Sequence, residues 1–248
     1  MAKDQVKGRT MESQNATVKP AARPARRSRA GHGSWQAEKS HLMRMHILDA
    51  TMKCLVNIGY SQTTTEKIAK QAGVSRGAMT HHFKSRAEVF NAAAEHITDI
   101  RVKEYDEAIR GVTQKSGTFP TAENMRDTIT TLQSYYMKPS FLAFQELVRG
   151  ARTDEQLQEV MGPLENSLDE RMSQSMVTRF PIWADEDLRE VGEALRDLIM
   201  HSLQGVAMNP APYLQGDRLE RLHGLLVETA MAQFERVYQA RQQQVVAT

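Results

Sequence analysis

Apolar residues recur with a helical period along most of the chain from Ser40 onward. The first such run, from Ile47 to Ile58, stops at Gly59, where a helix is expected to end. Alternation of apolar and polar residues with period two, which indicates strands, is not evident. The pattern therefore predicts an all-α fold.

Two short helices and one long helix are expected next. Thr63 and Glu66 have the spacing of a capping box and predict the start of a second helix, which Gly73 ends. Ser75 is a good N-cap for a third helix that ends near Phe83. A further capping box at Ser85 begins a helix that is expected to reach about Arg110.

The remaining sequence has the pattern of five more helices, which makes about nine in all. Pro163 lies inside one of them and is expected to kink it. The last two helices are strongly amphipathic. The loops between these helices are expected near residues 116–120, 138–139, 151–153, 181–184 and 209–216.

The charge is distributed unevenly, although the net charge is only +2. Residues 1–37 carry eight Lys or Arg against two Asp or Glu, and residues 38–90 carry eight against four. Residues 91–248 carry 16 against 24. This asymmetry predicts a region that binds a polyanion, followed by a larger acidic domain.

Residues 1–37 are expected to form a basic, disordered tail, because Pro, Ala, Arg, Gly and Ser offer little to bury. The tail is either an arm that contacts DNA, a solubilising extension or the product of an incorrectly assigned start codon. Residues 38–90 are expected to form one domain and residues 91–248 a second.

The composition argues against several classes of protein. Cys54 is the only cysteine, so an internal disulfide is impossible. Neither a secretory signal nor a membrane span is expected, and the cytoplasm is the default location. His81 and His82 are adjacent and project about 100° apart on a helix, a poor arrangement for one metal ion. With no catalytic or phosphate-loop motif, we expect no enzymatic activity, no metal and no cofactor.

Residues 63–83 have the spacing of a helix-turn-helix, whose second helix enters the major groove of DNA. Helical geometry directs Met79, His82 and Phe83 inward. The opposite face is polar and small, as base contacts require. Its members are Arg76, Gly77, Thr80 and His81.

Arg76 suits the O6 and N7 atoms of guanine, and Thr80 suits a base edge or a thymine methyl group. Lys84 and Arg86 would reach phosphates, and Thr64 would offer its hydroxyl and amide to another phosphate. The alternative is an ordinary helical hairpin with a solvated polar face.

The run from Ile47 to Phe90 closely resembles the N-terminal domain of TetR-family transcriptional regulators. It shares the family's glycines, a Thr-Thr start, the turn I-A-x-x-A-G-V-S and the H-F-K end. The resemblance implies a homodimer of about nine helices per chain that binds operator DNA. It places Arg76, Gly77 and Thr80 on bases. The residues implied for the DNA backbone are Thr64, Ser75, His81, Lys84 and Arg86. The family usually has tyrosine where this chain has Thr80, so a contact from that ring is lost.

The resemblance also implies an effector pocket and a dimer interface in the C-terminal region. Independently, the apolar stripes of the last two helices would form a four-helix bundle with a second copy, unless they pack inside one subunit. The interface residues expected are Leu195, Leu198, Leu203, Leu222, Leu226 and Phe234. Aromatic and methionine side chains would line an apolar pocket or form plain core. The pocket residues expected are Tyr136, Met137, Phe141, Phe144, Gln145, Met172, Met176 and Trp183.

These expectations favour a ligand-responsive regulator, most simply a repressor that a small apolar effector releases from a palindromic operator. A helical carrier protein that has lost DNA binding is the alternative. Arg76 and the positive charge of residues 38–90 distinguish the two, since a carrier has no use for them.

Overall fold

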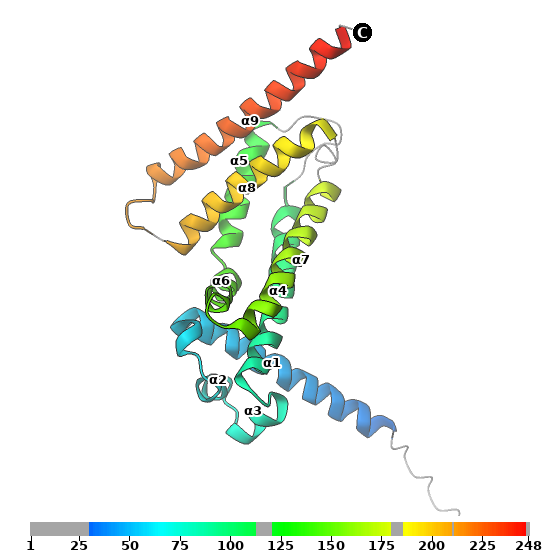
Figure 1. Cartoon of the computed structure of the whole chain (residues 1–248), viewed down its shortest axis with the longest axis vertical. Coiled ribbons are helices and arrows are strands. Elements are labelled where there is room, and N and C mark those ends of the chain that lie inside the picture. The colour runs from blue at the N-terminus through cyan, green and yellow to red at the C-terminus, as the bar shows by residue number, and fades with distance from the viewer. Residues whose placement is uncertain (1–29, 113–120, 180–185, 210, 247–248) are drawn as a thin grey trace, which may run out of the picture. The chain divides into compact units, whose positions relative to one another are not determined.

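The computed structural model describes residues 30–112, 121–179, 186–209 and 211–246, and all regular structure in these ranges is α-helical (Figure 1). The predicted fold class is therefore confirmed for the described residues. Their nine helices are α1 (Ala30–Gln62), α2 (Thr65–Ala72), α3 (Arg76–His82), α4 (Arg86–Arg110), α5 (Ala122–Tyr136), α6 (Pro139–Ala151), α7 (Glu155–Arg179), α8 (Glu186–Met208) and α9 (Asp217–Val246).

The described residues divide into two units, one up to Ser40 and one from His41 onward, and the residues of α1 belong to both. The helix begins at Ala30, ahead of the expected Ser40, so the end of the segment expected to be disordered is helical. Within the first unit, the Lys39 ammonium lies 5.4 Å from the centre of the Trp35 ring, an i,i+4 contact that favours a helix. Residues 1–29 of the expected tail lie outside the described residues.

Gly59 interrupts α1 with φ 73° and ψ 170°, a conformation that glycine adopts without steric cost. The helical conformation is thus broken at the predicted residue, although α1 resumes beyond it and ends at Gln62. The cap of the next helix is Thr64 and not Thr63, so the predicted Thr63–Glu66 capping box is wrong. The Thr64 hydroxyl accepts from the amide of Lys67, whereas the Thr63 hydroxyl donates to the Gly59 carbonyl at 2.7 Å.

The turn between α2 and α3 forms as predicted. Gly73 is left-handed with φ 65°, and its amide donates to carbonyls in the last turn of α2. Ser75 caps α3 by accepting from the amide of Ala78 at 3.1 Å. On either side of that cap, Val74 is half-buried and Met79 is 2% exposed, both packed against the hydrophobic core.

Helix α4 is the central element of the second unit and packs against α5, α6 and α7 (Figure 1). Ser85 caps it as expected, and the helix ends at Arg110 as expected. The Glu88 carboxylate accepts from the amide of Lys84 at 2.7 Å rather than from that of the capping residue. Helix α5 packs against α8 and α9, which also pack against each other.

Loops occur at the expected positions near residues 138, 152, 209 and 211–216, whereas residue 210 and the loops expected at 116–120 and 181–184 lie outside the described residues. Pro163 is inside α7 as predicted. Among the described helices, none is both long enough and apolar enough to cross a membrane.

Candidate functional site

The exposed face of α3 is the one that the sequence predicts. Arg76, Gly77, Thr80 and His81 are exposed, whereas Met79 and Phe83 are each only 2% exposed. Gly77 has no side chain, and the space where a Cβ would lie is open, with the Ser75 hydroxyl 3.9 Å away. Another molecule can therefore approach the backbone closely there. The helix therefore presents one arginine, one hydroxyl and one imidazole to solvent beside an open backbone position.

Two of the hydroxyls expected to contact DNA make local hydrogen bonds. The Thr80 hydroxyl donates to the Arg76 carbonyl at 2.9 Å, which leaves its methyl group and an oxygen lone pair outward. The Thr64 hydroxyl serves as the cap of α2. Thr64 nevertheless stays at a helix N-terminus, where further amides favour an anion.

Contacts from α1 fix the orientation of α3. The Arg44 guanidinium lies 4.2 Å from the centre of the Phe83 ring and donates to the His82 carbonyl at 3.1 Å. His46 bonds the Ala72 carbonyl at 2.8 Å and so holds the end of α2. Partial burial, together with the nearby His81 and Arg44, lowers the pKa of His82 and favours its neutral form.

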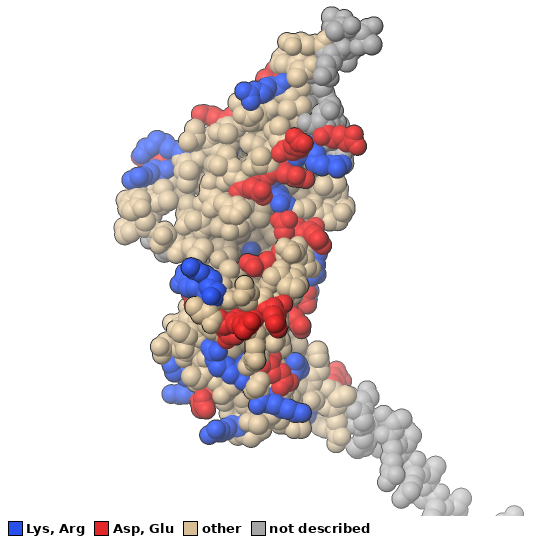
Figure 2. Space-filling view, viewed as in Figure 1, with Lys and Arg blue, Asp and Glu red and all other residues tan. Residues whose placement is uncertain are grey.

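Figure 2 shows basic side chains gathered at the end of the second unit that carries α2 and α3, below a band of acidic side chains. The basic residues described there include Lys67, Lys70, Arg76 and Lys84, and all four are exposed. A surface of this sign attracts a polyanion over a distance of about one Debye length, roughly 8–10 Å at physiological salt.

Unlike these exposed basic side chains, Arg86 is directed toward neighbouring residues of its own chain. Its guanidinium donates to the Tyr60 hydroxyl at 3.0 Å and to the Tyr60 carbonyl at 3.1 Å, and it lies 3.7 Å from the Asp154 carboxylate. It also stacks 4.4 Å from the centres of the Tyr60 and Phe90 rings. The geometry favours a structural role for Arg86 over the expected phosphate contact, because its donors are already used within the chain.

Tyr60 joins the helix-turn-helix to α6 and to the start of α7. Its hydroxyl donates to Asp154 at 2.5 Å, and its amide donates to Glu146 at 3.0 Å. A Cβ placed on Gly150 would lie 2.5 Å from the Tyr60 ring, so the ring packs directly on the α6 backbone. We call Tyr60, Arg86, Glu146, Gly150 and Asp154 the latch.

The pKa values of the latch reflect these contacts. Burial first, and then the bond to Asp154, raise the pKa of Tyr60. The same bond is the main cause that lowers the pKa of Asp154. A carboxylate that accepts from a tyrosine stays ionised, and the tyrosine stays protonated.

Four of the eight expected pocket residues belong to the hydrophobic core. Tyr136, Phe141, Phe144 and Met172 are at most 4% exposed. Met137 is 54% exposed, which does not fit an enclosed pocket. Gln145 and Met176 are half-buried, and Trp183 lies outside the described residues.

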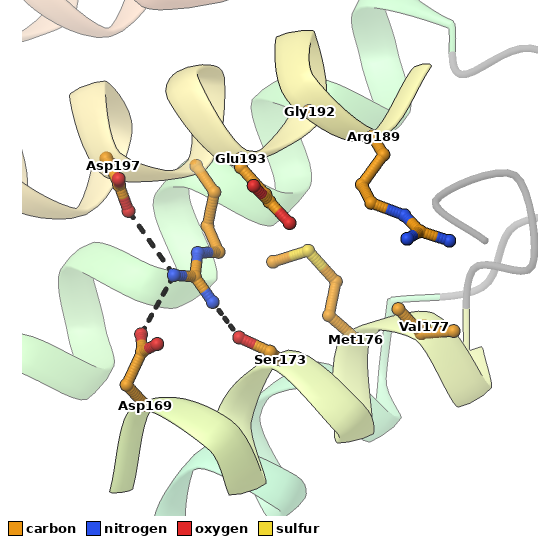
Figure 3. Close-up of a pocket in the computed structure, with 9 residues that line it drawn as sticks. Asp169, Ser173, Met176, Val177, Arg189, Gly192, Glu193 and Asp197 are labelled. Atoms are coloured by element: carbon orange, nitrogen blue, oxygen red, sulfur yellow. Dashed lines mark hydrogen bonds and ion pairs between the residues drawn. The ribbon is translucent and has the colours of Figure 1, made fainter. Parts of the chain in front are cut away.

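A cleft of about 510 Å³ lies between α7 and α8, and of the expected pocket residues it includes Met176 (Figure 3). The walls of this cleft are more polar than those of the apolar pocket that the sequence predicts. Arg196 donates to Asp169 at 2.8 Å, to Asp197 at 3.3 Å and to the Ser173 hydroxyl, while Arg189 and Glu193 line the remaining wall (Figure 3).

Four of the expected interface residues are buried within one subunit. Leu195, Leu203, Leu226 and Phe234 are at most 5% exposed, so they are unavailable for direct contact with a second chain. Leu222 is partly buried against the same core. Leu198 is 45% exposed. They are buried because the apolar stripes of α8 and α9 pack on α5 and on each other.

Sequence reasoning did not find the latch, the acidic and basic residues of the cleft, or Arg101, which is 3% exposed. Arg101 did leave a signal, because it interrupts the apolar stripe Ile97–Arg101–Tyr105 at a spacing of four. The residues of the latch left none, since their partners are distant in sequence. In the described part of the chain, no group of three or more His, Cys, Asp or Glu residues could hold a metal ion.

The fold and the exposed face of α3 define an all-helical helix-turn-helix protein. Residues 47–93 match the family model described as bacterial regulatory proteins, tetR family. HTH-type transcriptional regulator AcrR of Shigella flexneri is 44% identical over 48 residues, which cover 19% of this chain and 22% of AcrR. An uncharacterized HTH-type transcriptional regulator of Mycobacterium bovis is 25% identical over 115 residues, 46% of this chain and 56% of that protein. The chain thus spans little more than half the length of this longer match.

Solved structures extend the similarity to the whole fold. A TetR-family regulator from Mesorhizobium loti superposes with a TM-score of 0.58 at 19% identity, covering 78% of this chain and 96% of that one. A transcriptional regulator from Streptomyces coelicolor gives a TM-score of 0.54 at 21% identity, covering 76% and 95%. Residues 47–93 thus match the tetR family in sequence, and the described fold is similar to that of TetR-family regulators.

Proposed function

We propose that this protein is a ligand-responsive transcriptional regulator that binds a palindromic operator as a homodimer and represses until a small effector releases it. The observation that carries the proposal is the exposed face of α3, with Arg76 beside the open backbone of Gly77. A bidentate arginine contact to guanine discriminates against other bases by about 1–3 kcal/mol.

Backbone contacts would come from residues around that face. Lys84 and His81 are exposed at the end of α3, and Ser75 and Thr64 lie at the N-termini of α3 and α2. Such contacts fix the position of a protein on the duplex without reading its sequence. Arg86 is omitted from this set because of its role in the latch.

The dimer would form through the exposed faces of α8 and α9. Exposed residues on α8 recur at alternating spacings of four and three, as in a helix-packing seam. They are Ala194, Leu198, His201, Gly205 and Met208. On α9, Leu225 is 59% exposed and would add an apolar side chain to this interface. Dimerisation would supply a second recognition helix for the second half-site.

Release from DNA would run through α6. Phe141 and Phe144 lie in the core in the first half of this helix, and Glu146 and Gly150 contact Tyr60 in the second half. An effector that displaces α6 would therefore move Tyr60 and, with it, the end of α1. The population would shift away from the DNA-binding conformation only to the extent that the effector binds the two conformations unequally.

Selection of genomic DNA fragments by purified protein at two salt concentrations tests this proposal. The proposal is supported if the wild type and Arg110→Ala both enrich a palindrome that Arg76→Ala does not enrich. Arg110 is an exposed arginine at the far end of α4 and serves as the control. Recovery of random, salt-sensitive DNA would instead favour the helical carrier, with only non-specific attraction to polyanions.

A further inference from the structure

Arg101 lies in the middle of α4 and is buried among aromatic rings. Its side chain is 3% exposed. The centre of the guanidinium is 5.0 Å from the ring centres of Tyr135 and Phe141 and 5.2 Å from that of Phe144. We call these three rings, together with Tyr136, the aromatic cage. The rings of the cage come from α5 and α6, and they surround the charged side chain of Arg101 on α4.

Among the described residues, no ion pair joins the guanidinium of Arg101 to an acidic side chain. Its Nε and Nη1 atoms are buried and have no hydrogen-bond partner within the part of the chain that the structure describes. The hydroxyl of Tyr135 is likewise buried without a partner there. Glu104, one turn further along α4, acts on Arg101 through its charge, but its carboxylate contacts the Ser140 hydroxyl and lies 3.9 Å from the Lys138 ammonium.

An unpaired buried charge is costly, and contacts with aromatic faces offset only part of that cost. Burial lowers the pKa of Arg101, but a guanidinium remains protonated in proteins. An arginine fork presents parallel N–H donors that match a carboxylate in geometry and charge. The surrounding rings match an apolar group.

We propose that Arg101 and the aromatic cage bind the carboxylate of an amphipathic organic anion, and that this class of molecule is the effector. The inference rests on the proposed function and narrows the apolar effector to one with an acidic end. The carboxylate would pair with Arg101 and accept from the Tyr135 hydroxyl, while the apolar part would lie among the rings.

Tyr136 links the cage to the cleft between α7 and α8. Its ring centre is 4.9 Å from that of Tyr135 and 5.1 Å from that of Phe141. Its hydroxyl accepts from Gln204 of α8 at 3.5 Å and is close enough to Arg196 and Asp169 of the cleft to be influenced by their charges. The ligand would enter from the cleft in Figure 3 by displacing Tyr136.

Binding at this position would reach the latch directly. Phe141 and Phe144 of the cage lie on α6, the helix that carries Glu146 and Gly150. A ligand that separates these rings from Arg101 has to shift α6, because both side chains are fully packed. The cage would thus be the place where effector binding changes the position of Tyr60.

Titration calorimetry on the full chain, without DNA, tests the proposal with benzoate, 3-phenylpropionate and decanoate, each beside its neutral amide. At least one carboxylate is expected to saturate, with its amide about tenfold weaker or more, as for the loss of a hydrogen bond to a charged group. Arg101→Met is expected to remove that preference, and Arg101→Lys to keep part of it. Arg110→Met, a substitution of an exposed arginine on the same helix, is the control.

Thermal unfolding of the same variants separates a binding role from a structural one. If Arg101 is retained for a ligand, Arg101→Met leaves the unfolding midpoint of the ligand-free protein unchanged or raises it. A clear fall in the midpoint would overturn the proposal, as would equal binding of acid and amide, or no binding of any probe. Competition by sulfate at equal concentration would show a general anion site and would also overturn it. DNA selection is measured separately, so this inference and the proposed function can fail independently.

Discussion

The guanidinium of Arg86 stacks on the ring of Tyr60, with 4.4 Å between their centres, and donates to the hydroxyl of the same residue at 3.0 Å. One arginine at the start of α4 thus holds the end of α1. The same tyrosine continues to Asp154 and Glu146. The helix-turn-helix is therefore attached to the larger helical region by specific polar bonds as well as by apolar packing.

Tyr60→Phe tests the hydroxyl of the latch. The substitution removes the bonds to Asp154 and Arg86 while keeping the ring, so the free energy of unfolding should fall by about 1–3 kcal/mol. Urea denaturation measures this change. Tyr213→Phe is the matched control, because Tyr213 is 66% exposed and its change should be within about 0.5 kcal/mol. Equal stability of Tyr60→Phe and the wild type would contradict the hydroxyl's role.

Gly150→Ala tests the packing of Tyr60 on α6. The added methyl group would meet the ring at 2.5 Å, so the ring or the helix must move, at a cost of about 1–3 kcal/mol. In a Tyr60→Ala background the methyl group has room, and the same change should be neutral or stabilising by up to about 1 kcal/mol. A double-mutant cycle by urea denaturation measures the difference. Additive effects would mean that Gly150 and Tyr60 do not act on each other.

Local signals in the sequence were sufficient for the helix-turn-helix. Gly59, Gly73 and the caps at Ser75 and Ser85 each act within a few residues, so spacing alone predicts them. The outward face of α3 follows from the helical period. The capping residue of α2 was misplaced by one position because three consecutive threonines offer the same hydroxyl.

Long-range contacts explain what the sequence did not reveal. Leu195 and Leu226 have the same apolar character whether they face their own subunit or a second one, so periodicity cannot distinguish the two. The sequence alone predicts a phosphate contact for Arg86, because its partners Tyr60 and Asp154 come close to it only in the folded chain. The same limit applies to the pocket, where Phe141 and Phe144 were expected as lining but pack around Arg101.

The acid sensitivity of the fold should depend on His223. Partial burial first, and then Arg126, lower the pKa of this residue, and its Nε2 has no hydrogen-bond partner among the described residues. The unfolded chain therefore takes up the proton first as the pH falls below about 6.5, and the folded state loses stability over that range. His223→Gln cannot become charged, so its stability should fall less between pH 7.5 and pH 5.5.

Urea denaturation at the two pH values measures this difference. His41→Gln is the control, because His41 is exposed and the substitution should leave the pH dependence of the wild type unchanged. A His223→Gln protein that loses as much stability as the wild type would exclude this residue as a source of acid sensitivity.

The exposed leucines of α8 and α9 should determine the oligomeric state. Leu198→Glu and Leu225→Glu each place a charge on the face proposed for the dimer, where each buried leucine contributes about 1.5–3 kcal/mol. Light scattering coupled to size-exclusion chromatography should therefore detect monomers at micromolar concentration, with no change in helix content. Leu142→Glu is the control, since Leu142 is an exposed leucine on α6. Dimers that survive both substitutions would place the interface elsewhere.

The central claim is that the exposed face of α3 reads the sequence of a DNA operator. The most direct test is titration of the recovered operator and of a scrambled duplex, at two salt concentrations, with the wild type, Arg76→Ala and Lys84→Ala. We predict that Arg76→Ala lowers the preference for the operator by about tenfold to a hundredfold. Lys84→Ala should weaken binding to both duplexes by the same factor. It should also reduce the salt dependence of binding by the amount expected for about one phosphate contact. An unchanged preference in Arg76→Ala would contradict the account.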